Sequence, residues 1–159
     1  MKIVVLKERS SEESRVAAVP ETVKKLTGAG HTLIVEPGAG LVAGFPDAAY
    51  EEAGAQISDK ELGNADLVMG VRRPPAEVLS QVKEGAGVIG LLEPHSINDS
   101  LGDFNARKLM ALSMEYTPRI TRAQSMDALS SQSNLAGYRA VIEGAALYGR
   151  AMPMMMTAA

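Results

Sequence analysis

The chain has 159 residues, a net charge of −3, and no cysteine. This length suits one domain with an apolar core, and the missing cysteines exclude disulfides and thiolate metal sites. The slight acidity argues against a nucleic-acid-binding face, which needs clustered basic residues. His31 and His95 are the only histidines, too few for a zinc cluster, so we expect no metal site.

Apolar runs in the sequence are short. Lys7 and Glu8 interrupt the run at the N-terminus, which is therefore not a signal peptide. No stretch reaches the roughly 20 apolar residues that a membrane helix needs. We therefore expect a soluble cytoplasmic protein, which would associate with a membrane only through partner subunits.

Short apolar strands alternate with helices along the chain. Strands are predicted over 3–6, 31–37, 65–71, 87–92 and 108–116, and helices over 20–30, 46–55, 75–85 and 98–108. This alternation predicts an α/β fold, a Rossmann- or flavodoxin-like parallel sheet with helices on both faces. A long C-terminal helix follows. The tail at 151–159 is apolar. It suggests that a partner protein or a continuation of the chain covers it, or equally that the tail packs on its own domain.

A glycine-rich segment, PGAGLVAG, follows the second predicted strand. Gly38, Gly40 and Ala43 fit the outline of a dinucleotide phosphate loop. Such a loop must lead directly into a helix, but Gly44 and Pro46 intervene here. We therefore interpret the segment as a plain glycine-rich turn.

The long helix, predicted to begin near Ser125, has an unusual polar face. Asp127, Ser130, Ser131, Asn134 and Tyr138 fall at helical spacing on one side. Serine, asparagine and aspartate are poorer helix formers than the lysine and glutamate of a solvated face. The pattern fits a site for a polar uncharged group such as an amide. It fits equally well an N-terminal cap followed by a small-residue helix interface.

Further residues extend these two interpretations. Leu129, Ala136 and Ala140 point away from the polar face, toward a predicted packing surface. Gly137 and Gly144 each cost about 1 kcal/mol of helix stability relative to alanine, which suggests that something approaches closely.

Two arginines, Arg119 and Arg122, precede the helix, with Gln124 between them and the polar face. Cations near a helix N-terminus oppose its dipole and so suggest an anion such as phosphate. Solvated surface arginines are the simpler alternative.

The residues from 117 onward, TPRITRAQSMDALSSQSNLAGYRAVIEGAALYGRAMPMMMTAA, closely resemble the NAD(H)-binding component (alpha subunit) of proton-translocating NAD(P) transhydrogenase. KERSSEESRVAAVPETVKKLTGAGH and EPGAG resemble the N-terminal signature that this component shares with alanine dehydrogenase. The resemblance implies an N-terminal α/β domain at 1–124 and an interdomain helix with an apolar tail at 125–159. The second nucleotide-binding domain of the family would be absent.

The resemblance also implies roles for individual residues. Arg119 would face the phosphates or the nicotinamide end of NAD(H). Asp127 would accept a hydrogen bond from the carboxamide NH₂, and Ser130 would bond the same carboxamide. Gln124 would reach toward the NADP(H) held by the partner component. Gln124 and Asp127 are thus the expected catalytic residues, because direct hydride transfer needs rings in near contact and no acid or base.

Alanine dehydrogenase is the second relative to consider. The lysine and histidine of its mechanism would fall at Arg72 and near Leu91, and His95, a few residues on, is a poor substitute. Arg15 matches the family arginine but lacks these partners. Because no proton donor is evident, amination of a keto acid is disfavoured.

We therefore predict a part of a transhydrogenase, inactive by itself, that belongs to an enzyme passing hydride from NADH to NADP. Its expected partners are a second nucleotide-binding domain or chain, a membrane proton channel with an NADP-binding component, and a second copy in a homodimer. It would lie in the cytoplasm, peripherally on the inner membrane. An alanine dehydrogenase-like oxidoreductase and a non-catalytic packing module are the alternatives.

Overall fold

Six parallel strands form one sheet, in a computed structural model that describes residues 1–95 and 102–150. The strands are β1 (Lys2–Val5), β2 (Thr32–Val35), β3 (Gln56–Ile57), β4 (Leu67–Arg72), β5 (Gly87–Leu91) and β6 (Met110–Ser113). Their spatial order is β3-β2-β1-β4-β5-β6. This is the doubly wound order of a Rossmann fold, so the predicted α/β class is confirmed.

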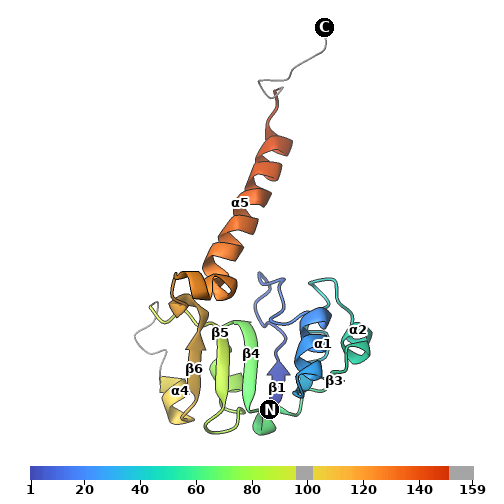
Figure 1. Cartoon of the computed structure of the whole chain (residues 1–159), viewed down its shortest axis with the longest axis vertical. Helices are drawn as coiled ribbons and strands as arrows, with labels where there is room; N and C mark the ends of the chain where they lie inside the picture. The colour runs from blue at the N-terminus through green and yellow to red at the C-terminus, as the bar shows by residue number, and fades with distance from the viewer. Residues whose placement is uncertain (96–101, 151–159) are drawn as a thin grey trace. The chain divides into compact units, whose positions relative to one another are not determined.

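Helices cover parts of both sheet faces (Figure 1). They are α1 (Pro20–Gly28), α2 (Asp47–Glu52), α3 (Ala76–Leu79) and α4 (Gly102–Ala106), with 3₁₀ turns at Leu62–Asn64, Met114–Tyr116 and Thr121–Met126. Val23 of α1 and Tyr50 of α2 pack on one face, and Leu79 of α3 and Phe104 of α4 pack on the other. Pro20 occupies the first turn of α1, as predicted, because the first turn needs no N–H donor.

The residues fall into two compact units, Met1–Tyr116 and the part from Thr117 onward. The second unit contains α5 (Ala128–Leu147). The predicted division at residue 124 and the missing second nucleotide-binding domain stay predictions. In the described ranges no helix has the length and apolarity needed to cross a bilayer. The apolar tail at 151–159 lies outside them.

Several predicted boundaries were wrong. The two-residue strand β3 was missed because it is too short to show a pattern. The helix expected over 75–85 covers only Ala76–Leu79, since the chain then turns and the Lys83 N–H donates to the Leu62 carbonyl at 3.2 Å. The strand expected over 108–116 ends at Ser113 and continues as a 3₁₀ turn.

Candidate functional site

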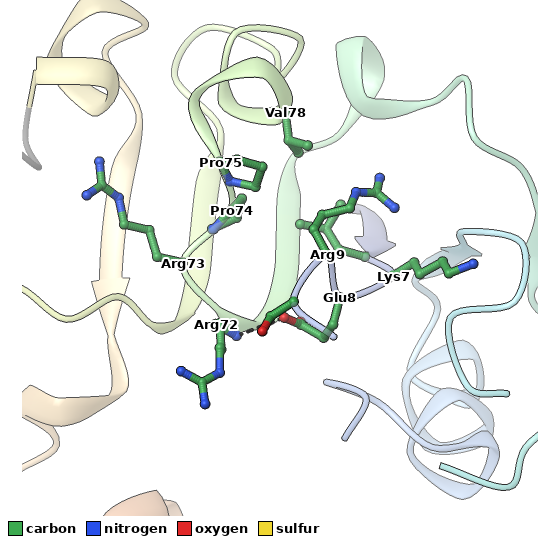
Figure 2. A pocket seen from close by; sticks show the side chains of 10 residues that line it. Lys7, Glu8, Arg9, Arg72, Arg73, Pro74, Pro75 and Val78 are labelled. Carbon is green, nitrogen blue, oxygen red and sulfur yellow. Dashed lines mark hydrogen bonds between the residues drawn. The ribbon is translucent and has the colours of Figure 1, made fainter. Parts of the chain in front are cut away.

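The strand order places a crevice between β1 and β4. The chain moves outward in opposite directions from these neighbouring strands, and in open parallel sheets ligands bind beyond the strand ends at such a reversal. The loops here line a small pocket of about 100 Å³, formed by residues 6–10, residues 72–75 and Val78 (Figure 2). This is the structural candidate for a ligand site in the first unit.

Two carboxylates fix the loops of this crevice. Glu8 follows β1 and accepts hydrogen bonds from the backbone N–H groups of Val71 (2.7 Å) and Arg72 (3.3 Å) at the end of β4. Figure 2 shows Glu8 directed at this backbone. Glu36, at the end of β2, accepts from the Lys7 N–H at 2.7 Å and from the Arg9 guanidinium at 2.8 Å. The strand ends are therefore tied together by charge-assisted bonds.

A third carboxylate, Glu13, joins two arginines. Its side chain is only 3% exposed and accepts bonds from Arg15 Nη2 at 2.7 Å and Arg72 Nε at 3.0 Å. The hydrogen bonds from Arg15 lower the pKa of Glu13 to about 2, against the opposing effect of burial, with Arg72 contributing further. Glu13 therefore stays ionised and holds Arg15 and Arg72 side by side.

Glu115 organises the neighbouring loop after β5. Its carboxylate accepts from the N–H groups of Leu92 (3.2 Å) and Glu93 (2.8 Å). Burial raises its pKa, but hydrogen bonds from the Ser113 hydroxyl and the backbone outweigh that effect and lower it. His95 packs edge-on against Tyr116, with ring centroids 5.3 Å apart. The contact described for His95 is thus with an aromatic ring.

The glycine-rich segment is a turn, as predicted. Its residues form consecutive turns, and the next helix, α2, begins only at Asp47. The Asp47 carboxylate accepts from the Gly38 N–H at 2.9 Å. A carboxylate facing this N–H repels phosphate, so the segment is no phosphate loop. At Gly40 a side-chain carbon would lie 2.5 Å from the Tyr50 hydroxyl, so close packing explains this glycine.

In the second unit, Asp127 caps α5. The prediction that the helix begins near Ser125 was wrong, because residues 121–126 form a 3₁₀ turn and α5 starts at Ala128. Asp127 Oδ1 accepts from the Ser130 N–H at 2.9 Å, and Oδ2 accepts from the Ser130 hydroxyl at 2.6 Å. These bonds, together with the nearby charge of Arg119, lower the pKa of Asp127. The N-terminal cap of the second interpretation is therefore present at Asp127, whereas its helix interface is not among the described contacts, and the carboxylate is ionised.

The polar face of α5 is exposed in its unit. Ser130, Ser131, Asn134 and Tyr138 are all exposed on the helix, and Asp127 lies half-buried at its N-cap. Arg119, Arg122 and Gln124 are also exposed. Their proposed roles toward a nucleotide therefore stay predictions.

Other faces of α5 are equally open. Leu129 is 50% exposed, and Ala136 and Ala140 are exposed, so the predicted packing surface has no described partner. A side-chain carbon at Gly137 or Gly144 would meet nothing within 4 Å. The close approach suggested by these glycines is thus not provided by the described residues.

The carboxylates at the crevice were not among the predicted site residues. In the sequence Glu8 and Glu13 look like ordinary loop residues and Glu36 like the end of a strand, although all three organise the loops of the crevice. Glu8 comes two residues after the first predicted strand and Glu36 lies near the end of the second, and this position at the strand ends was an available signal. Glu13, seven residues after the first predicted strand, gave no such signal. Within residues 1–95 and 102–150, no three acidic or histidine side chains gather as a metal site would require.

Residues 4–136 match the family model for the alanine dehydrogenase/PNT N-terminal domain, and the chain belongs to this family. It is 49% identical to the Rhodospirillum rubrum protein that forms the first part of NAD(P) transhydrogenase subunit alpha, over 100% of this chain and 44% of that protein. A crystal structure of transhydrogenase from Sinorhizobium meliloti superimposes with a TM-score of 0.93 at 46% identity, covering 99% of this chain and 48% of that one. Alanine dehydrogenase 1 of Staphylococcus aureus is 35% identical over 91% of this chain and 38% of its own length. The chain therefore spans less than half the length of these relatives.

Proposed function

We propose that the chain forms part of the NAD(H)-binding component of a proton-translocating transhydrogenase. The complete enzyme passes hydride directly from NADH to NADP held by a partner component, coupled to proton movement in a membrane subunit. The component is a homodimer on the cytoplasmic side of the inner membrane. A second nucleotide-binding domain supplies most of the contacts that bind NAD(H), so the 159-residue chain is inactive alone.

The observation that carries this proposal is the extent of the similarity. The identity of 49% to the Rhodospirillum rubrum subunit spans the whole chain, α5 included, whereas the alanine dehydrogenase of Staphylococcus aureus reaches 35% over 91% of it. Arg119, Gln124, Asp127 and Ser130 all precede or open α5. They are the candidates for the nucleotide site.

The bonding pattern of Asp127 and Ser130 fits a carboxamide NH₂. The Ser130 hydroxyl hydrogen is already donated to Asp127, so the pair presents acceptor lone pairs. A carboxylate has about four acceptor positions, and Ser130 occupies two of them. The two N–H donors of a carboxamide match what remains, and the ionised state of Asp127 strengthens such a bond.

NAD(H) supplies the hydride itself when bound, and this chain contributes orientation. Asp127 and Ser130 would fix the rotation of the nicotinamide ring through its carboxamide. Arg119 is a cation near the same acid and suits the phosphates or the nicotinamide end. Gln124, a neutral hydrogen bonder, would face the NADP(H) side. Because hydride transfer requires two rings held in near contact, such positioning is the contribution expected of the protein.

A chimeric subunit tests this proposal. Residues 1–159 replace the matching part of the Rhodospirillum rubrum subunit, and the chimera is assembled with the other transhydrogenase components. Hydride transfer from NADH to an NADP analogue, measured by absorbance, should be restored to a rate near that of the unmodified complex. A folded chimera that assembles without transferring hydride would contradict the proposal and favour a packing module.

The arginine pair favours a second candidate, an alanine dehydrogenase-like oxidoreductase. Arg15 and Arg72 stand at the positions matched to the substrate-binding arginine and lysine, and both bind Glu13. Loss of NADH absorbance when a chimera carrying this chain meets pyruvate and ammonia would establish that activity. We expect no loss, because no proton donor is found at the histidine position near Leu91.

A further inference from the structure

Glu115 lies where the chain leaves the sheet. It follows β6 within the 3₁₀ turn Met114–Tyr116, and Tyr116 is the last residue of the first unit. The neighbouring strands β5 and β6 end at nearly the same level, at the edge where ligands bind in open parallel sheets (Figure 1). Arg119, a candidate for the nucleotide site, comes four residues after Glu115. The location of this chain end therefore constrains where Arg119 can lie.

The Glu115 carboxylate has no free acceptor position. Oε1 accepts from the Glu93 N–H at 2.8 Å. Oε2 accepts from the Leu92 N–H at 3.2 Å and from the Ser113 hydroxyl at 2.5 Å. The backbone N–H of Glu115 itself is a fourth donor. A carboxylate has about four acceptor positions, so these donors fix Glu115 in one orientation and leave nothing for a ligand.

These bonds hold the loop after β5 in an unfavourable conformation. Glu93 has a φ of 51°, in the left-handed region that residues other than glycine rarely adopt. Such a conformation persists only where the surrounding structure enforces it, and it is concentrated at functional sites. Glu115 enforces it by accepting from two successive N–H groups, those of Leu92 and Glu93. Stability alone would favour glycine at position 93, so the strained loop indicates a functional constraint on its position.

A short and stiff segment separates Glu115 from Arg119. Three residues intervene, and the ring of one of them, Pro118, fixes its φ. The Ile120 N–H donates to the Pro118 carbonyl at 2.9 Å, and the 3₁₀ turn Thr121–Met126 follows directly. A shift of the backbone at Glu115 is therefore transmitted to Arg119 with little loss.

We propose that Glu115 is a positioning residue for hydride transfer, whose carboxylate fixes the chain end from which the candidate nucleotide-site segment 119–130 continues. Because its acceptor positions are occupied, Glu115 acts through this segment and does not contact NAD(H). A misplacement of about 1 Å far from the reacting atoms can cost about a hundredfold in rate. The inference rests on the proposed function, because it takes Arg119, Gln124 and Asp127 as parts of the nucleotide site.

Glu115→Gln in the assembled chimera tests the inference. The substitution keeps the size of the side chain, but an amide nitrogen then faces an N–H or O–H donor, so at least one bond is lost. The hydride-transfer rate at saturating NADH should fall at least about tenfold. The dissociation constant of NADH should change less than about twofold, because the second domain is proposed to supply most of the NAD(H) contacts.

Two further variants complete the test. Glu84→Gln, at an acid whose side chain is 58% exposed in the same unit, is the matched control and should leave the rate and the NADH affinity unchanged. Ser113→Ala removes one donor from the Glu115 carboxylate and serves should Glu115→Gln fold poorly. Its hydride-transfer rate should fall about threefold, because the other donors remain.

A native rate in the folded Glu115→Gln complex, or in the Ser113→Ala complex where the first variant does not fold, would overturn the inference. The proposed function would then stand, because the unmodified chimera still transfers hydride. A rate and an NADH affinity that fall together would overturn the inference in favour of a general structural role for Glu115. An unmodified chimera that transfers no hydride would overturn the proposed function and this inference with it.

Discussion

Replacing Glu13 by glutamine tests the electrostatics of the crevice. The substitution keeps the shape of the side chain but removes the charge that holds Arg15 and Arg72. A pKa lowered from 4.5 to about 2 corresponds to about 3 kcal/mol of stability at neutral pH. Because the guanidiniums are 40% and 44% exposed and regain water, the expected loss is about 2 kcal/mol.

The pH dependence follows from the direction of this shift. The folded state holds the lower pKa, so the stabilisation is complete above pH 4.5 and is lost as the pH falls toward about 2. At pH 3 the difference in free energy of unfolding between the native chain and the Glu13→Gln variant should fall to less than roughly half its value at neutral pH. Urea unfolding followed by circular dichroism at pH 7 and pH 3 measures both differences. Glu12→Gln, at an exposed neighbouring acid, is the matched control and should change little.

A difference that is equal at both pH values, or absent at pH 7, would refute the role assigned to the Glu13 carboxylate. Equal destabilisation by Glu12→Gln would likewise refute it, because that result would indicate a general charge effect and not the specific pair of bonds.

Three further predictions concern packing and binding. Gly40→Ala places a carbon 2.5 Å from the buried Tyr50 hydroxyl. Overpacking of this kind costs about 1–3 kcal/mol, so the midpoint of thermal unfolding should fall by several degrees. An unchanged midpoint would contradict the close contact. Gly137→Ala meets nothing within 4 Å, so helicity of the 159-residue chain by circular dichroism should stay the same or rise, and a loss would reveal a further contact. Calorimetric titration of the 159-residue chain with NAD should detect weak binding or none, whereas micromolar affinity would contradict a second domain that supplies most of the grip.

The fold was predictable because the strands are nearly continuous apolar runs. Ile3, Val4 and Val5 are all buried, since a parallel sheet hides both faces of its central strands. The strand β3 and the early end of α3 were not predictable, because tertiary hydrogen bonds such as Lys83 to Leu62 set them and local propensity does not.

The candidate site was predictable only in part. The polar residues that open α5 stood out because serine, asparagine and aspartate are poorer helix formers than the lysine and glutamate expected on a solvated face. Asp127 was placed inside the helix because the capping bond to Ser130 depends on backbone dihedrals that the residue pattern does not carry. Glu13 and Arg72, whose bond completes the pairing of Arg15 with Arg72, are 59 residues apart in sequence, and only the order of β1 and β4 brings them together.

The most direct test of the proposed nicotinamide site is the hydride-transfer rate of Asp127→Asn in the assembled chimera. Asparagine caps a helix as well as aspartate does, so α5 should persist, while the charged acceptor for the carboxamide is lost. The rate should fall about tenfold to a hundredfold, while Glu143→Gln, which neutralises another acid on the same helix, should leave it unchanged. A native rate in the Asp127→Asn complex would contradict the claim that this helix end positions the nicotinamide.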